Sequence, residues 1–467
     1  MAASRMIVVG GGLAGLSAAH TLLEHGKRVL LLDKKPSLGG NSVKASSGIN
    51  GADTEAQRAL NIQDSVETFY ADTASSAGPE LARPALITAL TSNSAGAIAW
   101  LTGTFGVDLS VLTRLGGHSA ARTHRDKSGV PGWAITSALM KKLTALAEVG
   151  DAPVTIIKGA RVLRLLEEDG AVVGVEYESG GTITTARGNV ILATGGYAAD
   201  FSPGSLLAQH RPDLLALSTT NGDHATGDGV RLATASALAR PAGTCDLAQV
   251  QVHPTGFVDP AAPAARTKFL AAEALRGAGG LLLDAAGARF VQEVDRRDVV
   301  TAAMQAVEAA GRGPVRLVLG PKAAAEVQKH CDFYVSKGLM TRYDNAAAFA
   351  TDAGIPVEGV LATFASYGTG GDPFGKAPHN AAYTPSEPLH VAIITPVVHY
   401  TMGGLAVDAF ARVLAAADGA PLPGLWAAGE VIGGVHGGNR LAGSSLLEAV
   451  VFGRIAGNSA AAAMPVV

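Results

Sequence analysis

A carboxylate and two guanidinium groups stand close together in a segment whose other residues are mostly apolar. Glu273 and Arg276 are three residues apart, so on a helix they would share one face and could hydrogen-bond. Arg297 follows after a glycine-rich, hairpin-like stretch at 279–290. Charged side chains are rarely buried without a partner, so the three groups could form a proton relay that ends at Arg297. The alternative is a surface ion pair on a capped helix, which is the commoner explanation of such a pair taken alone.

A glycine-rich turn near the start of the chain predicts a dinucleotide site. The order strand, helix, strand is predicted from the runs 5–10, 16–26 and 28–33. The spacing Gly10-x-Gly12-x-x-Gly15 allows a tight turn whose backbone amides face a pyrophosphate at the N-terminus of the helix. Asp33 ends the second strand, where a carboxylate can bind a ribose hydroxyl.

Two domains are expected, because 467 residues exceed the size of one ordinary hydrophobic core. Strands punctuated by the hairpin signals Asp169-Gly170 and Gly180-Gly181 are predicted between 154 and 196. Further helices are predicted at 64–77, 85–101, 134–148, 299–310, 321–328 and 446–463, and a loop is predicted around 366–378. Asp64 is expected to cap the first of these helices.

Composition excludes several classes of protein. The net charge of −3 and the 16% of charged residues offer no basic surface for nucleic acid, so a small molecule is the expected partner. Cys245 and Cys331 form no CxxC or CxxCH motif, and we expect no metal, attached haem or iron–sulfur cluster. We expect no membrane anchor and no targeting segment, which predicts a soluble protein of the cytoplasm or of an organelle lumen.

The assembled motifs resemble the soluble fumarate reductase flavoproteins, which are related to the flavoprotein subunits of succinate dehydrogenase and to L-aspartate oxidase. The resemblance covers nearly the whole chain, and 39–52 is most similar to the yeast and trypanosomatid soluble enzymes. It is carried by the Gly10 turn, Gly39-Gly40-Asn41-Ser42, Ala193-Thr194-Gly195-Gly196, His253-Pro254-Thr255, Glu273-Ala274-Leu275-Arg276-Gly277, Arg297-Asp298, His399-Tyr400-Thr401-Met402-Gly403-Gly404, Ala428-Gly429-Glu430 and Asn439-Arg440-Leu441.

The resemblance implies an α/β fold, with a Rossmann-like FAD-binding domain of the glutathione-reductase type at 1–247 and 399–467. An inserted α+β clamp, or capping, domain would occupy 248–398. Non-covalent FAD is expected because Asn41-Ser42 stand where the membrane-bound relatives carry the linking histidine. The implied FAD-binding residues are Gly10, Gly12, Leu13, Ala14, Gly15, Asp33, Lys34, Gly40, Asn41, Ser42, Ser47, Gly48, Ala193, Thr194, Gly195, Asp228, Glu430, Ser445 and Leu446.

The implied reaction is the reduction of fumarate to succinate. Hydride would come from N5 of reduced FAD, and Arg297 would protonate carbon, resupplied through Glu273 and Arg276. The implied ligands of the dicarboxylate are His253, His399, Arg440 and Gly443. Ala272 replaces a threonine that is frequent in the family, so one hydrogen bond to the substrate must come from elsewhere or be missing.

Three other functions fit the same motifs. An L-aspartate oxidase would share the FAD motifs and release an imine, with oxygen as acceptor. Urocanate reductases and ketosteroid dehydrogenases fit less well, because two arginines and two histidines suit a dicarboxylate better than a ring. A non-catalytic flavin-binding redox protein is the third. For a reductase, the electron donor would be an external reduced flavin or an NADH-linked reductase.

Overall fold

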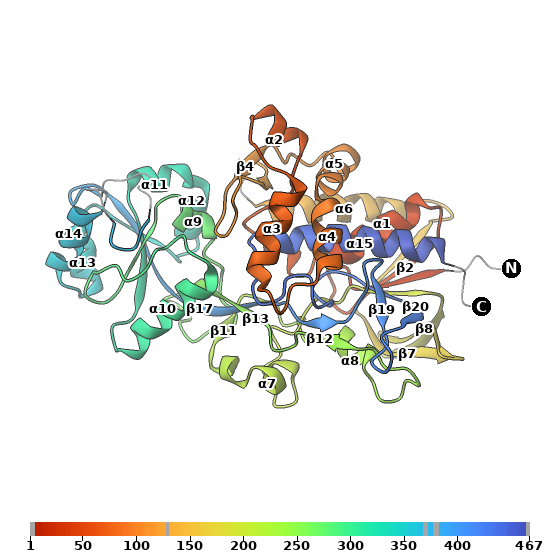
Figure 1. Ribbon diagram of the computed structural model, residues 1–467. Coiled ribbons are helices and arrows are strands. Elements are labelled where there is room, and N and C mark those ends of the chain that lie inside the picture. The colour runs from red at the N-terminus through yellow and green to blue at the C-terminus, as the bar shows by residue number, and fades with distance from the viewer. Residues whose placement is uncertain (1–4, 128–129, 368–371, 377–382, 464–467) are drawn as a thin grey trace.

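Two lobes form the computed structural model, which describes residues 5–127, 130–367, 372–376 and 383–463. One lobe holds a parallel sheet covered by α1 and α15, and the other holds the helices from α9 to α14 (Figure 1). Separate clusters of buried apolar side chains form the cores of the two lobes.

A six-stranded sheet organises the first lobe, in the order β19-β20-β10-β1-β2-β6. Its strands are β1 (Met6–Val9), β2 (Val29–Asp33), β6 (Val154–Lys158), β10 (Val190–Leu192), β19 (Arg412–Leu414) and β20 (Pro421–Ala427). All pairs are parallel except the edge pair of β19 with β20. The strands β1, β2 and β10 therefore end at one edge, which is where α/β folds bind ligands.

The helices of this lobe correct two sequence predictions. They are α1 (Leu13–Glu24), α2 (Glu55–Ala59), α3 (Val66–Ala77), α4 (Pro84–Ser92), α5 (Ser94–Phe105), α6 (Pro131–Ala147), α7 (Leu206–His210), α8 (Asp228–Ala233) and α15 (Ser444–Ala462). The helix predicted at 85–101 is two helices that meet at Asn93. Asp64 does not cap α3; Ser65 accepts the capping bond from the Thr68 amide, and Asp64 pairs with the buried Arg122.

Small sheets and single turns complete this lobe. They are β3 (Ile49–Asn50), β4 (Val111–Thr113), β5 (Thr123–Arg125), β7 (Ala160–Glu168), β8 (Ala171–Ser179), β9 (Thr182–Arg187), β12 (Thr244–Cys245), β18 (Gly404–Leu405), η1 (Ser42–Lys44) and η2 (Pro212–Ala216). The strands β7, β8 and β9 form an antiparallel sheet, which confirms the hairpins predicted between 154 and 196.

A mixed sheet organises the second lobe. Its strands are β11 (Ser218–Thr219), β13 (Val250–Phe257), β14 (Leu281–Leu283), β15 (Val315–Leu319), β16 (Thr341–Tyr343) and β17 (Leu389–Thr401). Its helices are α9 (Glu273–Gly277), α10 (Arg297–Ala309), α11 (Pro321–Glu326), α12 (Gln328–Ser336), α13 (Ala346–Ala353) and α14 (Val357–Ser366). Helices α13 and α14 were not predicted from the sequence. The loop predicted around 366–378 lies partly outside the described residues.

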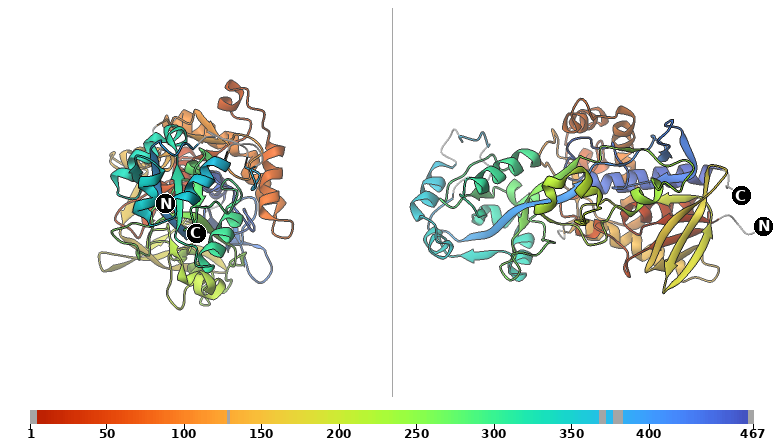
Figure 2. Two further views of the ribbon diagram at one scale, coloured as in Figure 1. Left: turned by 90° about the vertical axis from the view of Figure 1, so that its left-hand side faces the viewer. Right: turned by 90° about the horizontal axis from the view of Figure 1, so that it is seen from below.

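Strand β17 connects the two lobes. It pairs with β13, β15 and β16 and extends from the second lobe toward the middle of the molecule (Figure 2). The predicted domain boundary at 398/399 therefore falls inside a continuous strand. The division into 1–247 with 399–467 and 248–398 stays a prediction.

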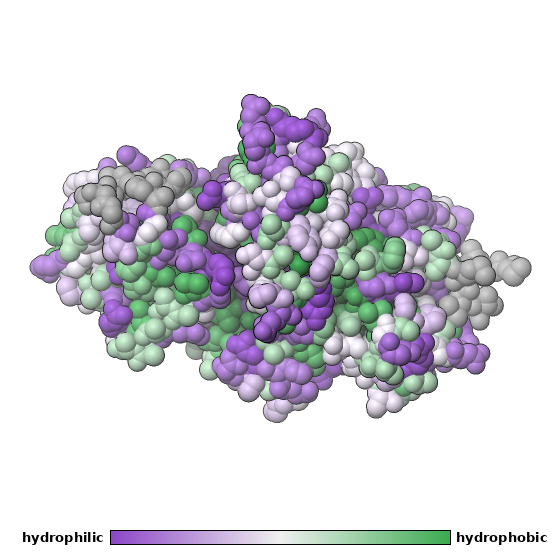
Figure 3. Space-filling model, viewed as in Figure 1, coloured by the Kyte–Doolittle hydropathy of each residue, from purple (hydrophilic) through white to green (hydrophobic). Residues whose placement is uncertain are grey.

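On the face that Figure 3 shows, hydrophobic and hydrophilic residues are interspersed on both lobes, and neither kind forms one large continuous patch. Within the described part of the chain, no helix combines the length and the hydropathy that a membrane span requires.

Candidate active site

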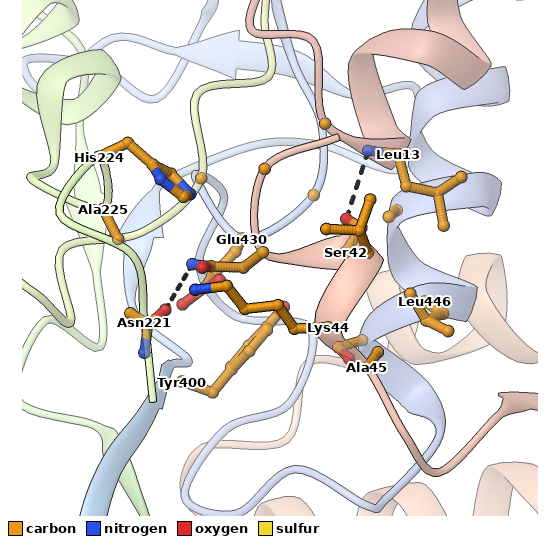
Figure 4. A pocket seen from close by; sticks show the side chains of 18 of the residues that line it. Leu13, Ser42, Lys44, Ala45, Asn221, His224, Ala225, Tyr400, Glu430 and Leu446 are labelled. Carbon is orange, nitrogen blue, oxygen red and sulfur yellow. Dashed lines mark hydrogen bonds between the residues drawn. The ribbon is translucent and has the colours of Figure 1, made fainter. Parts of the chain in front are cut away.

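A cavity of about 690 Å³ lies at the carboxyl ends of β1, β2 and β10, a size typical of cofactor and ligand sites (Figure 4). Its wall includes every residue that the resemblance assigned to FAD except Gly15. It also includes four of the expected active-site residues: Arg297, His399, Arg440 and Gly443.

Close contacts explain the glycines of the turn after β1. Gly10 has φ +107°, and a Cβ there would lie 2.2 Å from the carbonyl oxygen of Ala193. A Cβ on Gly15 would lie 1.9 Å from the carbonyl oxygen of Gly10, so Gly15 packs behind the turn and away from the cavity. The nearest atom to a Cβ on Gly12 is Ser42 Oγ at 4.0 Å. Gly12 therefore faces open space, where a bound pyrophosphate could approach the backbone.

Polar side chains hold this turn in place. The amide of Gly11 donates to Asp33 Oδ2 at 2.7 Å, and the amide of Lys35 donates to Asp33 Oδ1 at 2.8 Å. The amide of Leu13 donates to Ser42 Oγ at 3.3 Å (Figure 4). A carboxylate offers about four acceptor positions, so Asp33 could still bind a ribose hydroxyl.

Several polar atoms around the cavity fit a dinucleotide. Thr194 Oγ1, His224 Nε2 and Ser46 Oγ are buried and have no hydrogen-bond partner among the described residues. Buried polar atoms are normally satisfied, so these three are available to a ligand. Lys34 Nζ lies 2.7 Å from Asp228 Oδ2, and this ion pair places both residues at the wall.

Glu273 lies between the two arginines of the predicted relay. Arg297 is the first residue of α10, and its Nε and Nη2 lie 2.9 and 2.8 Å from Glu273 Oε2. Arg276 Nη2 lies 3.9 Å from the same oxygen, and the Gly116 amide donates to Oε1 at 3.2 Å. Burial opposes ionisation of Glu273, but the charges of Arg297 and Arg276 outweigh it and lower its pKa to about 2. Glu273 is therefore a carboxylate at neutral pH.

Arg276 faces a buried ion cluster. Its side chain is 1% exposed, and its Nη1 donates to the backbone carbonyl oxygen of Glu293. The carboxylate of Glu293 is paired with Arg289 at 2.7 Å and with Lys376 at 3.2 Å. Arg276 itself makes no direct hydrogen bond to Glu273, because 3.9 Å exceeds hydrogen-bond length.

Gln251 is a site residue to which the sequence analysis gave no role. Its Oε1 accepts hydrogen bonds from Arg297 Nη1 at 2.9 Å and from Arg440 Nη2 at 2.8 Å. Its Nε2 donates to Asn439 Oδ1 and to the carbonyl oxygen of Arg440. One amide thus joins Arg297 and Arg440 at the cavity wall. The sequence did contain a signal for this role. Gln251 and His253 are two residues apart on a strand, so their side chains share one face, and Val252 points to the other.

The two histidines occupy different layers. His399 lines the cavity, and its Nδ1 lies 2.7 Å from Thr220 Oγ1. His253 is fully buried behind it, with the ring centroids 5.1 Å apart, and is not part of the cavity wall. His253 Nε2 has no hydrogen-bond partner among the described residues. Burial, reinforced by the charge of Arg297, holds both pKa values well below 6.5, so both rings are neutral at pH 7.

Arg440 presents an unsatisfied donor. Burial, together with the charge of Arg297, lowers its pKa to about 10, which leaves it protonated at neutral pH. Its guanidinium carbon lies 4.4 Å above the ring of Tyr400, and its Nε has no hydrogen-bond partner in the described part of the chain. Among the cationic side chains of the cavity wall, Arg297 and Arg440 are held together by Gln251, and a planar carboxylate suits such a pair.

Comparisons with known proteins identify the family of the chain. The profile of the FAD binding domain family matches residues 5–446. The chain is 45% identical to a fumarate reductase of Schizosaccharomyces pombe, over 99% of this chain and 90% of that protein. It is 42% identical to fumarate reductase 1 of Saccharomyces cerevisiae, over 99% of each. The open conformation of a flavocytochrome c3 fumarate reductase has a TM-score of 0.78 at 31% identity, covering 98% of this chain and 78% of that one. The chain therefore belongs to the FAD binding domain family, and FAD is its cofactor.

Proposed function

We propose that this protein reduces fumarate to succinate and binds its FAD without a covalent link. The observation that carries the proposal is the pair Arg297 and Arg440, which line the cofactor cavity together with His399 while Glu273 contacts Arg297 from behind. When bound, reduced FAD supplies the hydride. The similarity to the fumarate reductases of two yeasts supports a dicarboxylate as the substrate.

The cations stabilise the reacting substrate. Hydride addition to an alkene places negative charge on the adjacent carboxylate, and preorganised positive groups are usually the largest catalytic contribution to such a step. Arg440, through its unpartnered Nε, and His399 bind that carboxylate, with Gly443 at the same wall. His253 is one layer deeper and binds the other carboxylate once the lobe that carries α9 to α14 closes as a clamp.

Arg297 donates the proton to carbon. Arginine is normally protonated at every accessible pH, so it can act as an acid only if its proton is replaced at once. Glu273 accepts hydrogen bonds from Nε and Nη2 of Arg297. It passes the replacement proton from Arg276 after the Arg276 guanidinium moves from 3.9 Å to within hydrogen-bond length. The electrons come from an external donor, a reduced flavin or an NADH-linked reductase.

Anaerobic reoxidation of the reduced enzyme tests this function. The flavin is reduced chemically, and its absorbance is followed after addition of fumarate, urocanate or oxygen. We expect rapid reoxidation by fumarate with stoichiometric succinate. Turnover of L-aspartate with peroxide formation, and no response to fumarate, would instead identify an amino-acid oxidase. Slow reoxidation by every organic acceptor would identify a non-catalytic flavoprotein.

A further inference from the structure

A buried chain of side chains lies behind Arg440, and the proposed reaction does not use it. Tyr400 is on β17, Glu448 is on α15, and His436 lies between β20 and α15. Their exposed fractions are 6%, 1% and 2%. Tyr400 lines the same cavity as Arg440, so the chain begins at the candidate active site (Figure 4).

Each member contacts the next. The Tyr400 hydroxyl donates a hydrogen bond to Glu448 Oε2, and His436 Nε2 lies 3.1 Å from that same oxygen. The guanidinium carbon of Arg440 lies 4.4 Å from the centroid of the Tyr400 ring. A buried carboxylate is costly unless it is hydrogen-bonded, and these two contacts satisfy Glu448 Oε2.

The hydrogen bond from the Tyr400 hydroxyl to Glu448 affects Arg440 through the aromatic ring of Tyr400. A phenol that donates to a carboxylate gains electron density on its ring faces, and this density is what attracts a cation. Burial and the charge of Glu448 hold the pKa of Tyr400 well above 10, so the hydroxyl remains a donor at neutral pH. Apart from this ring, Arg440 is held through Gln251 Oε1 and the carbonyl oxygen of Leu441.

We propose that Glu448 is a positioning residue for dicarboxylate binding, because through Tyr400 it holds the Arg440 guanidinium in the orientation that receives a substrate carboxylate. His436 contacts the same oxygen of Glu448 and helps to fix its carboxylate. This inference rests on the proposed function, since it deepens the role of the same site.

Malonate titration of the FAD-loaded enzyme, followed by the flavin absorbance change, tests the proposal together with steady-state KM and kcat for fumarate. Tyr400→Leu removes the ring, and we expect its malonate Kd and fumarate KM to rise at least about tenfold. Tyr400→Phe and Glu448→Gln should each raise both constants about threefold, with a smaller effect on kcat. The double variant should match the single ones, because Glu448 acts through the hydroxyl, whereas independent structural effects would add.

A matched control comes from the other lobe, where Tyr343 donates to Asp352 in a second tyrosine–carboxylate pair. Tyr343→Phe should leave malonate binding unchanged. Wild-type malonate affinity in both Glu448→Gln and Tyr400→Phe, or additive effects in the double variant, would overturn the inference while fumarate reduction by the wild type stands. Should Glu448→Gln not fold, Tyr400→Phe tests the same link with the packing kept. A wild-type enzyme that responds to neither fumarate nor malonate would overturn the proposed function itself, and the inference with it.

Discussion

Arg297 approaches Glu273 side-on, with Nε and Nη2 both directed at one carboxylate oxygen, Oε2, at 2.9 and 2.8 Å. This arrangement leaves Nη1 as the remaining nitrogen of the guanidinium, and Nη1 donates to Gln251. Glu273 hydrogen-bonds the proposed acid directly and lies 3.9 Å from Arg276 Nη2, so a relay needs Arg276 to move within hydrogen-bond length. A group that only neutralises charge needs no such partner.

Glu273→Gln should lower kcat by roughly 10²-fold or more and change KM by only a few-fold, because the amide keeps the shape but cannot relay a proton. Pre-steady-state reoxidation of the reduced flavin by fumarate is the measurement. The exposed Glu358 on α14 offers a control in Glu358→Gln, which should leave the rate unchanged. A near-wild-type rate in Glu273→Gln would mean that Arg297 only neutralises the negative charge of the substrate and that no proton relay operates.

Arg297→Lys should keep only a small activity, with a pH optimum shifted toward the lysine pKa, because lysine keeps the charge but replaces the acid. Arg297→Ala should abolish fumarate reduction and leave FAD binding intact. The pH–rate profile of the lysine variant decides whether Arg297 is the proton donor or only a cation that stabilises the substrate. An unshifted profile with substantial activity would argue for pure electrostatics.

Gln251→Leu should reduce kcat/KM by about tenfold or more. It removes the acceptor that Arg297 and Arg440 share, and leaving a buried donor unsatisfied costs about 1–3 kcal/mol. Gln251→Glu should differ, because it adds a negative charge that competes with the substrate for both cations. Steady-state kinetics with fumarate and inhibition by malonate separate the two variants. Equal kcat/KM in wild type and Gln251→Leu would contradict the bridging role.

Gly12→Val should prevent FAD binding, whereas Gly15→Ala should destabilise the fold. A Cβ at Gly12 meets open space, so the apo-protein should keep its stability while the valine blocks FAD. A Cβ at Gly15 would lie 1.9 Å from the carbonyl oxygen of Gly10, so the fold itself should lose stability. Urea unfolding of the apo-proteins and FAD content after reconstitution are the two measurements. Loss of apo-protein stability in Gly12→Val would contradict the assignment of Gly12 to the FAD-binding surface.

Acid precipitation should release all of the flavin into the supernatant, because Asn41 and Ser42 stand at the cavity wall in the position where the resemblance implies a linking histidine in covalent relatives. Yellow colour that stays with the precipitated chain would contradict non-covalent binding.

Glu430 should make the apo-protein less stable as pH rises. Burial raises its pKa from 4.5 to about 7, although Thr401 donates two hydrogen bonds to it. The folded state therefore binds more protons than the unfolded state between pH 4.5 and 7, and stability falls through that window by roughly 3 kcal/mol at most. Glu430→Gln should remove this slope, as measured by urea unfolding at pH 5 and pH 7.5. If the free energy of unfolding changes equally with pH in Glu430→Gln and in the wild type, Glu430 is not the source of the pH dependence.

Local spacing was enough to predict part of the site. The turn of Gly10 and Gly12 depends on backbone geometry within a few residues, and the structure places it at the cofactor cavity. Glu273 and Arg276 are neighbours because one helical turn separates them. Helix α15 was also predictable, since its apolar pattern continues for 19 residues.

Only the tertiary structure decided the remaining contacts. Gln251 and Arg440 are 189 residues apart, and they meet because β13 packs beside the loop before α15. The pairing of β13 with β17 places His253 behind His399 and not at the cavity wall. Such contacts follow from which strands pair and how side chains fill the space between them, and no pattern within a short segment specifies that.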